Sequence, residues 1–380
     1  MVKAYLDNSA TTRPCDAAIE AVNNCLRKGF YNPSAVYAPA VDVFKEIRSC
    51  RECCLSAVQA KNCDLFFTSG GTESNNLAII GSVMRMRGKQ IVAVSAVEHP
   101  SVSEAFASLQ TLGHDVRIIG VNAQGELDWA SLKKALDDGA SLVSCMQVNN
   151  ETGALLDAPK LHELVAGRAI IHVDGVQGFL RVPFDMRYAD LYTFSGHKIH
   201  APKGIGGLIV RKGVKLAPRQ IGGGQEFGMR SGTENTPGIA GLYAAVQNML
   251  QMGDVRFKDL MQKKLYLIKV FRESVPELLI NGPEPEKAAP HIVNISFPNV
   301  RGEVMLHALE SDGICVSTGS ACSSKKLKVS HVLLSMGIPA NRAEWALRFS
   351  LSPYTTYEEI DYAAQRLKVQ YDLLKHFQRR

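Results

Sequence analysis

The sequence lacks the features of a membrane, secreted or disordered protein. Its 380 residues contain no apolar stretch approaching the roughly 20 residues that cross a bilayer. The first residues, MVKAYLDNSATT, lack the apolar core of a signal peptide. Charged residues make up 21% of the chain and hydrophobic residues 46%, which is ordinary for a globular protein. The net charge of +6 comes from mostly scattered basic residues. We therefore expect a cytoplasmic protein that contacts neither a membrane nor nucleic acid directly.

A disulfide framework and a zinc site are also absent from the pattern. The nine cysteines have no regular spacing. The segment CRECC, with Cys50, Cys53 and Cys54, has no matching Cys/His pair at zinc spacing. Apolar residues recur three and four apart around it, over residues 41–60, so we interpret these as helical thiols partly packed in the core. We expect no metal. Cys322 is different, because it lies among small polar residues in STGSACSSKK.

Short apolar runs alternate with helical stretches from Phe66 to about residue 250. The runs are DLFFTS, QIVAVSA, DVRIIGV, SLVSCMQV, AIIHVDG, DLYTFSG and GGLIVR. Such βα alternation predicts an α/β fold with a mostly parallel seven-stranded sheet flanked by helices. In such a sheet, functional residues cluster at the carboxyl ends of the strands.

A second pattern follows a helical bridge over residues 239–275. Strands are expected at IVNISF, ICVST and ALRFSLSPY, and helices at EVMLHALES and YEEIDYAAQRLKVQYDLLKHF. This order indicates a smaller α+β domain with an antiparallel sheet. We expect residues 15–250 to form the large domain, and residues 1–14 with 251–380 to form the small one, which carries the Cys322 segment.

Two strand ends carry residues suited to an aldehyde cofactor. Lys198, in LYTFSGHKIHAPKG, can form a Schiff base with an aldehyde; a solvated loop lysine is the alternative. Asp174 ends AIIHVDG, where a buried carboxylate needs a cationic partner such as the protonated ring nitrogen of pyridoxal phosphate. Gln177 would then reach the phenolic oxygen of the ring. A helix-capping aspartate is the alternative.

Three further strand ends carry polar residues. FFTSGGTESNNLAI joins a glycine pair to a helix start at Thr72 and Glu73, which favours a phosphate but lacks the spacing of a nucleotide P-loop. His99, in SAVEHPSV, can stack on a planar cofactor and transfer protons. Asn149 and Asn150, in QVNNETG, can hold a cofactor or substrate. Five such strand ends together favour a small aldehyde-phosphate cofactor.

At these residues the sequence resembles the class V aminotransferase family, of fold type I. Within that family it resembles the cysteine desulfurases of the nitrogen-fixation and housekeeping iron–sulfur type. The matching motifs span the chain: YLDNSATT, NPS, TSGGTESNN, EHPSV, VNNETG, HVDGVQ, FSGHKIHAPKGIG, GGGQEFGMRSGTEN, GSACSS and LRFSLSPYTTYEEID.

The resemblance implies a role for each matching residue. Lys198 would be the Schiff-base lysine, Asp174 the partner of the ring nitrogen, and His99 the stacking and proton-transfer residue. Other positions would contact the cofactor: Gln177 and Asn150 its phenolic oxygen, and Gly71, Thr72, Ser195 and His197 its phosphate. Thr233 would reach the phosphate of a neighbouring subunit, which implies a homodimer.

The resemblance also implies the substrate and the product. Arg348 would grip the carboxylate of L-cysteine, with Asn32 beside it. Cys322 would accept the sulfur as a persulfide, leaving alanine, and pass it to an acceptor protein such as an iron–sulfur scaffold or a tRNA-thiolation enzyme. Tyr37 and Ala40 depart from the histidine and glycine that many members carry there. The short C-terminus does not support the docking extension of some members.

Two other functions remain open at this point. A selenocysteine lyase or cysteine-sulfinate lyase of the same family would use the same cofactor without an obligatory protein thiol. A non-catalytic sulfur carrier is the alternative of a different class. The lysine, aspartate, histidine and arginine candidates argue against the carrier, and the GSACSS segment argues against the lyases.

Overall fold

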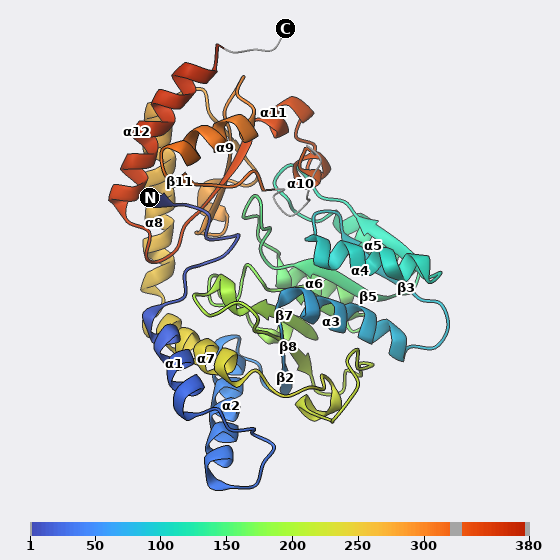
Figure 1. Ribbon diagram of the computed structural model, residues 1–380. Helices are drawn as coiled ribbons and strands as arrows, with labels where there is room; N and C mark the ends of the chain where they lie inside the picture. Colours follow the sequence, from blue (N-terminus) through green and yellow to red (C-terminus); the bar gives the residue numbers. More distant parts are fainter. Residues whose placement is uncertain (1, 320–328, 377–380) are drawn as a thin grey trace.

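A seven-stranded sheet forms the centre of the larger part of the molecule (Figure 1). The computed structural model describes residues 2–319 and 329–376. The strand order is β2-β8-β7-β6-β5-β3-β4. The strands are β2 (Cys63–Thr68), β3 (Ile91–Ser95), β4 (Asp115–Ile119), β5 (Ala140–Met146), β6 (Ile170–Asp174), β7 (Leu191–Ser195) and β8 (Gly206–Arg211). All seven expected strands are present, and the mostly parallel α/β sheet is confirmed.

The strand directions bring the functional ends together. β4, β3, β5, β6 and β7 pair in parallel, whereas β8 runs antiparallel to both of its neighbours, β7 and β2. Because two reversals cancel, β2 runs in the same direction as β7. The carboxyl ends of six strands therefore meet at one edge of the sheet, as expected for a ligand site in an α/β fold.

Helices cover both faces of this sheet. Side chains alternate along each strand, so Val92 and Val94 of β3 pack in one cluster with α3 and α4, while Ala93 packs in another with α2, α5, α6 and α7. Cys50 and Cys54 of α2 are buried in that second cluster, which confirms the helical interpretation of CRECC. The helices are α1 (Asp16–Lys28), α2 (Ala38–Ala57), α3 (Gly71–Arg85), α4 (Pro100–Thr111), α5 (Trp129–Asp137), α6 (Ala158–Val165) and α7 (Thr236–Gln251).

The second sheet is antiparallel, as expected. It consists of β9 (Leu279–Asn281), β10 (Ile292–Ser296) and β12 (Ala346–Ser350), in the order β12-β10-β9. The helices beside it are α8 (Val255–Ser274), α9 (Gly302–Ser311), α10 (His331–Ser335), α11 (Ala340–Glu344) and α12 (Tyr357–Leu374). The expected bridge over residues 239–275 is two helices, α7 and α8, separated at Gly253, which has φ +59°. The ICVST strand is also shorter than expected: only β11 (Ile314–Cys315) forms, and it pairs in parallel with β1 (Ala4–Tyr5).

The two sheets have separate apolar cores. One core gathers buried residues between Cys15 and Met249, and the other joins Ala4 and Leu6 to residues 260–371. A smaller cluster connects the two sides, because Val97, just after β3, packs with residues of α10 and α11. Across residues 2–319 and 329–376, no helix is long and apolar enough to span a membrane.

Candidate active site

A buried carboxylate occupies the carboxyl end of β6. Asp174 is 5% exposed. Its Oδ2 accepts a hydrogen bond from Asn75 Nδ2, and its Oδ1 accepts one from the Val176 N–H, both at 2.9 Å. Asn75 is itself fixed by the hydroxyl of Thr193, which donates to Asn75 Oδ1 at 2.6 Å. Neutral donors offset only part of the cost of burying a carboxylate. The position therefore favours a cation placed against Asp174.

Lys198 follows β7 at the end of the 3₁₀ turn η2 (Gly196–Lys198). Its ammonium group donates to the carbonyl oxygens of Ser9 at 2.6 Å and Ala10 at 2.8 Å. Gln177 Nε2 donates to the same Ser9 oxygen at 2.9 Å. A carbonyl of the N-terminal segment thus joins two of the predicted cofactor residues. The sequence pattern did not single out Ser9, although it lies in the YLDNSATT motif.

His99 precedes α4 as its N-cap residue. Its Nδ1 accepts a hydrogen bond from the Ser101 N–H at 3.1 Å and lies 2.9 Å from Ser101 Oγ. Burial is the main cause that lowers the pKa of His99; Asp174 opposes this effect and Lys198 adds to it. With Nδ1 accepting, the neutral ring carries its proton on Nε2. His99 is therefore a neutral, flat ring beside Asp174 and Lys198, as the predicted stacking role requires.

The predicted phosphate site combines a helix start with β7. A Cβ added at Gly71, the first residue of α3, would lie 2.6 Å from Val176 Cγ2, so only glycine fits there. Ser195 Oγ lies 3.5 Å from the place that a Cβ on Gly70 would take. Burial, then Lys198, Lys203 and Arg181, lower the pKa of His197 to about 4. A neutral His197 and the first N–H groups of α3 suit an anion.

Arg348 lies on β12, with its side chain 5% exposed. Its guanidinium forms an ion pair with Asp7 at 2.7 Å and donates to the Asn150 carbonyl oxygen at 2.9 Å. Its Nε is buried without a hydrogen-bond partner among the described residues, and so is Oδ1 of Asn150. The structure therefore brings Arg348 and Asn150 together, each with one free polar atom. Asp7 was not predicted, although it also belongs to YLDNSATT.

The two asparagines after β5 differ in role. Asn149 is buried and holds the turn: its Nδ2 donates to the Val97 carbonyl, and its Oδ1 accepts from the N–H groups of Glu151 and Thr152. These internal contacts leave Asn150 as the residue available to a ligand.

Two of the described candidates, Thr233 and Asn32, do not belong to this cluster, and one further candidate is not described. Cys322 lies outside the described residues. Thr233 and Thr72 are both exposed, but Thr72 still belongs to the first turn of α3. Asn32 is exposed in the α1–α2 connection, where its Oδ1 accepts from the Ser34 N–H at 2.9 Å. The flanking helices α1 and α2 pack on α7 (Figure 1), whereas Arg348 lies on β12 of the second sheet, and the expected place of Asn32 beside Arg348 stays a prediction.

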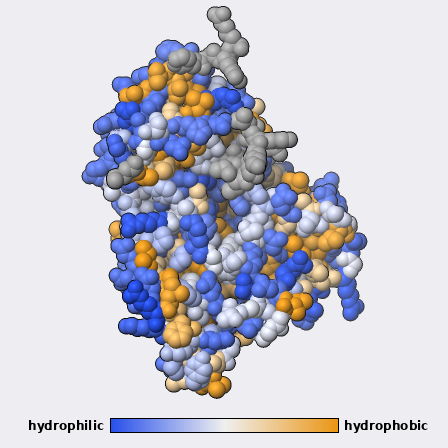
Figure 2. Space-filling model, viewed as in Figure 1, coloured by the Kyte–Doolittle hydropathy of each residue, from blue (hydrophilic) through white to orange (hydrophobic). Residues whose placement is uncertain are grey.

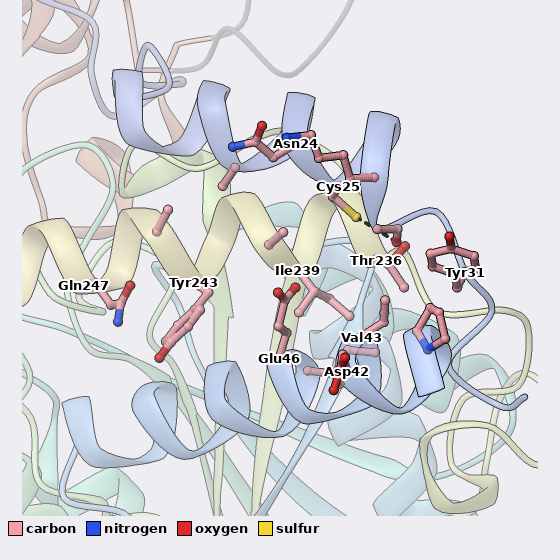
Figure 3. Close-up of a pocket in the computed structure, with 17 residues that line it drawn as sticks. Asn24, Cys25, Tyr31, Asp42, Val43, Glu46, Thr236, Ile239, Tyr243 and Gln247 are labelled. Carbon is pink, nitrogen blue, oxygen red and sulfur yellow. Dashed lines mark hydrogen bonds between the residues drawn. The ribbon is translucent and has the colours of Figure 1, made fainter. Parts of the chain in front are cut away.

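A cavity of about 530 Å³ between α1, α2 and α7 is separate from the cluster (Figure 3). Asn24 and Cys25 of α1, Glu46 of α2, and Ile239 and Tyr243 of α7 line it, and Figure 3 shows Ile239 and Tyr243 pointing toward α2. Tyr37 and Ala40, where the sequence departs from the resembling family, belong to the same α1–α2 region: Tyr37 is exposed and Ala40 is buried.

The family model for class V aminotransferases matches residues 4–363. This chain belongs to that family. Among its curated relatives, a cysteine desulfurase of Trichormus azollae is 39% identical over 360 residues, which cover 94% of this chain and 90% of that protein. A solved NifS-like protein superposes with a TM-score of 0.91 at 31% identity, covering 98% of this chain and all of that one. Members of the family generally depend on pyridoxal phosphate.

A second solved structure is that of a protein in complex with an amino acid. SspA in complex with cysteine has a TM-score of 0.81 and 28% identity to this chain, covering 93% of this chain and 100% of that one.

Proposed function

We propose that this chain is a pyridoxal-phosphate-dependent cysteine desulfurase. It would remove sulfur from L-cysteine, release L-alanine and leave a persulfide on Cys322. The observation that carries the proposal is the meeting of Lys198, Asp174 and His99 at one sheet edge, with Arg348 brought to the same place by the second sheet. The similarity to a protein solved with cysteine supports the substrate class.

The residues present fit the cofactor. Asp174 is buried with only neutral hydrogen-bond donors, as a partner for a protonated ring nitrogen would be. Gly71, Thr72, Ser195 and His197 would hold the phosphate, and Thr233 would do so from a second subunit. Gln177 and the free Oδ1 of Asn150 would face the phenolic oxygen. When bound, the cofactor would supply a temporary store for the electron pair released at the substrate α-carbon.

The protein groups then have distinct tasks. Arg348 would bind the substrate carboxylate, because its planar fork matches a carboxylate and its Nε has no other partner among the described residues. Lys198 would remove the α-proton and return it. His99, neutral at pH 7, would hold or pass a proton through Nε2. The Cys322 thiolate would attack the substrate sulfur.

The transfer balances without an outside oxidant or reductant. A bond forms between the two sulfurs, and the bond between the substrate sulfur and Cβ breaks. The electron pair of the broken bond stays on carbon, which takes up a proton and becomes the methyl group of alanine. Cysteine and the Cys322 thiol are thereby converted to alanine and the Cys322 persulfide. The substrate carbon is reduced and the sulfurs are oxidised by the same two electrons.

A homodimer is part of the proposal. Asn32 and Thr233 are exposed and would contribute to the site of a second copy. Near them, α1, α2 and their connection expose apolar side chains, and Figure 2 shows apolar surface over α1 and α7. The exposed large apolar residues of this α1–α2 surface are Ile19, Leu26, Phe30, Val36, Tyr37, Val41 and Phe44. Large exposed apolar patches mark interaction sites.

The persulfide would be passed to an acceptor protein. An iron–sulfur scaffold and a tRNA-thiolation enzyme are the acceptors expected from the resemblance. All eight described cysteines are free, which suits the reducing cytoplasm where such acceptors work.

The decisive experiment incubates the purified protein with L-cysteine and measures alanine, together with the mass of the peptide that contains Cys322. We expect one alanine for each sulfur added to Cys322 in the first turnover. Cys322→Ser should keep the cofactor absorbance and abolish sulfide release. Undiminished turnover of Cys322→Ser would refute the role of this thiol, and bound cofactor without any alanine would refute the proposed activity. Parallel assays with selenocysteine separate the lyase alternative.

A further inference from the structure

One buried carboxylate lies between the two ends of the segment that carries Cys322. Glu151 follows Asn150 in the turn after β5 and is 3% exposed. The hydroxyl of Ser330 donates to Glu151 Oε2 at 2.5 Å. A Cβ added to Gly319 would lie 2.8 Å from the same oxygen. Gly319 is the last described residue before Cys322, and Ser330 follows Val329, the first described residue after it, so both sides of the Cys322 segment lie beside Glu151.

The backbone of Glu151 is held from two sides. Its N–H donates to Asn149 Oδ1 at 3.0 Å, and its carbonyl oxygen accepts from Asn294 Nδ2 at 3.3 Å. Asn294 of β10 is paired in register with Arg348 of β12. The backbone of Glu151 is therefore bonded to β10, the strand that pairs with β12 and Arg348. These backbone contacts do not involve the Cys322 segment.

Ser330 and Gly319 each have a local geometry that suits a carboxylate beside them. Ser330 is the N-cap of α10, and its oxygen accepts from the Leu333 N–H at 3.1 Å while its hydroxyl proton goes to Glu151. Gly319 has φ +82°, so a side chain there would be strained as well as too close to the carboxylate. Burial raises the pKa of Glu151, whereas Ser330, His331 and Arg348 lower it.

We propose that Glu151 is a positioning residue for sulfur transfer: it binds Ser330 on one side of the Cys322 segment and lies against Gly319 on the other, and so sets both residues in relation to Arg348. This inference rests on the proposed function. Glu151 would touch neither substrate nor cofactor. Its loss should slow the attack of Cys322 on the substrate sulfur, while cofactor binding and substrate binding persist.

The test measures persulfide formation on Cys322 in a single turnover by mass spectrometry. In Glu151→Ala we expect a rate at least about tenfold lower, in line with the loss of one hydrogen bond to a charged group. The KM for L-cysteine should change less than about twofold and the cofactor absorbance should remain, because other residues provide those contacts. Glu151→Gln keeps an acceptor for the Ser330 hydroxyl and should recover most of the rate. Glu163→Gln, an exposed position on α6, is the matched control and should behave as the wild type.

Two results would overturn the inference. One is persulfide formation in Glu151→Ala within about twofold of wild type. The other is a slow rate in a folded, cofactor-bound Glu151→Ala that Glu151→Gln does not recover, because Gln retains the acceptor for the Ser330 hydroxyl. If Glu151→Ala does not fold, Ser330→Ala decides, with the same tenfold loss expected and an unchanged rate contradicting us. Parallel assays of Cys322→Ser keep the hypotheses apart: active Cys322→Ser refutes the proposed function, whereas inactive Cys322→Ser with normal Glu151→Ala refutes only the role of Glu151.

Discussion

Glu98 directly precedes His99, and its carboxyl group is buried. Its Oε1 accepts from the Ser95 hydroxyl at 2.6 Å and from the Met146 N–H at 2.7 Å, while Oε2 has no partner among the described residues. Burial, with a contribution from Asp174, raises the pKa of Glu98 from 4.5 to about 8. A protonated Glu98 at pH 7 adds no negative charge beside Asp174, which therefore remains the carboxylate available to a cationic ring.

This shift gives stability a defined pH dependence. Between pH 4.5 and about 8 the folded state keeps a proton on Glu98 that the unfolded state has lost. The free energy of unfolding therefore falls as pH rises through this window. Glu98→Gln, which keeps the acceptor but cannot ionise, should remove that part of the decline. Urea unfolding at about pH 5 and about pH 8 measures it: the gain of Glu98→Gln over wild type should be larger at the higher pH. Equal gains at both values would contradict the assignment.

The predicted site residues can be located from their neighbours in the sequence, whereas the missed ones depend on contacts with distant residues. Lys198, Asp174 and His99 follow apolar runs directly, so a local pattern locates them at strand ends. Asp7, Ser9 and Glu151 act through contacts with residues far away in the chain, such as Arg348 and Ser330. No local pattern indicates which distant side chain they meet.

Among the helices, α2 is joined to the segment before α7 by a buried ion pair. Arg51 binds both oxygens of Glu226 at 2.9 Å and donates to the Leu65 carbonyl. Glu226 Oε2 also accepts from the Phe67 N–H at 2.8 Å. Its side chain is 4% exposed, so the carboxylate depends on Arg51 for its charge compensation. The contact fixes the start of the segment that leads to Thr233.

Arg51→Ala should therefore destabilise the protein by about 3 kcal/mol, because it leaves a buried carboxylate unpaired. Arg48→Ala, on the same helix, removes only an exposed ion pair with Glu52 and should cost less than about 1 kcal/mol. Denaturant unfolding of both variants gives the comparison. A similar cost for the two substitutions would show that the buried pair has no special role.

The elements themselves were predictable where apolar runs are long. Strands such as β6 and β8 agree with the expected runs within about two residues. β1 and β9 were missed, because strands of two and three residues have no recognisable period and depend on partners elsewhere. The break between α7 and α8 lies at Gly253, a residue suited to a positive φ, within a pattern that otherwise continues as a helix.

For the molecule as a whole, we propose two domains, residues 15–250 and residues 1–14 with 251–380. The separate apolar cores support this division, since the N-terminal Ala4 and Leu6 pack with the second core. The small cluster between Val97 and α10 is then an apolar contact between the domains, close to His99.

The proposed homodimer predicts that a charge placed on the α1–α2 surface separates the two subunits. Phe44 on α2 is 55% exposed, and Phe44→Glu should place a charge in the subunit interface. We expect this variant to sediment as a monomer and to lose cofactor-dependent activity, because Thr233 would no longer reach a second site. Val369→Glu, on α12 and 50% exposed in wild type, is the control and should stay dimeric. Wild-type protein that sediments as a monomer while fully active would contradict the proposal.

The N-terminal segment has a consequence for how the enzyme is made. Ser9 binds Lys198 through its carbonyl and the Ser350 hydroxyl through its N–H, and Asp7 binds Arg348. These partners are synthesised in the middle and near the end of translation. Asp7 and Ser9 are synthesised first, but they cannot form these contacts until residues 348–350 have been synthesised. A nascent chain that lacks residues 348–350 therefore lacks the partners of Asp7 and of the Ser9 N–H.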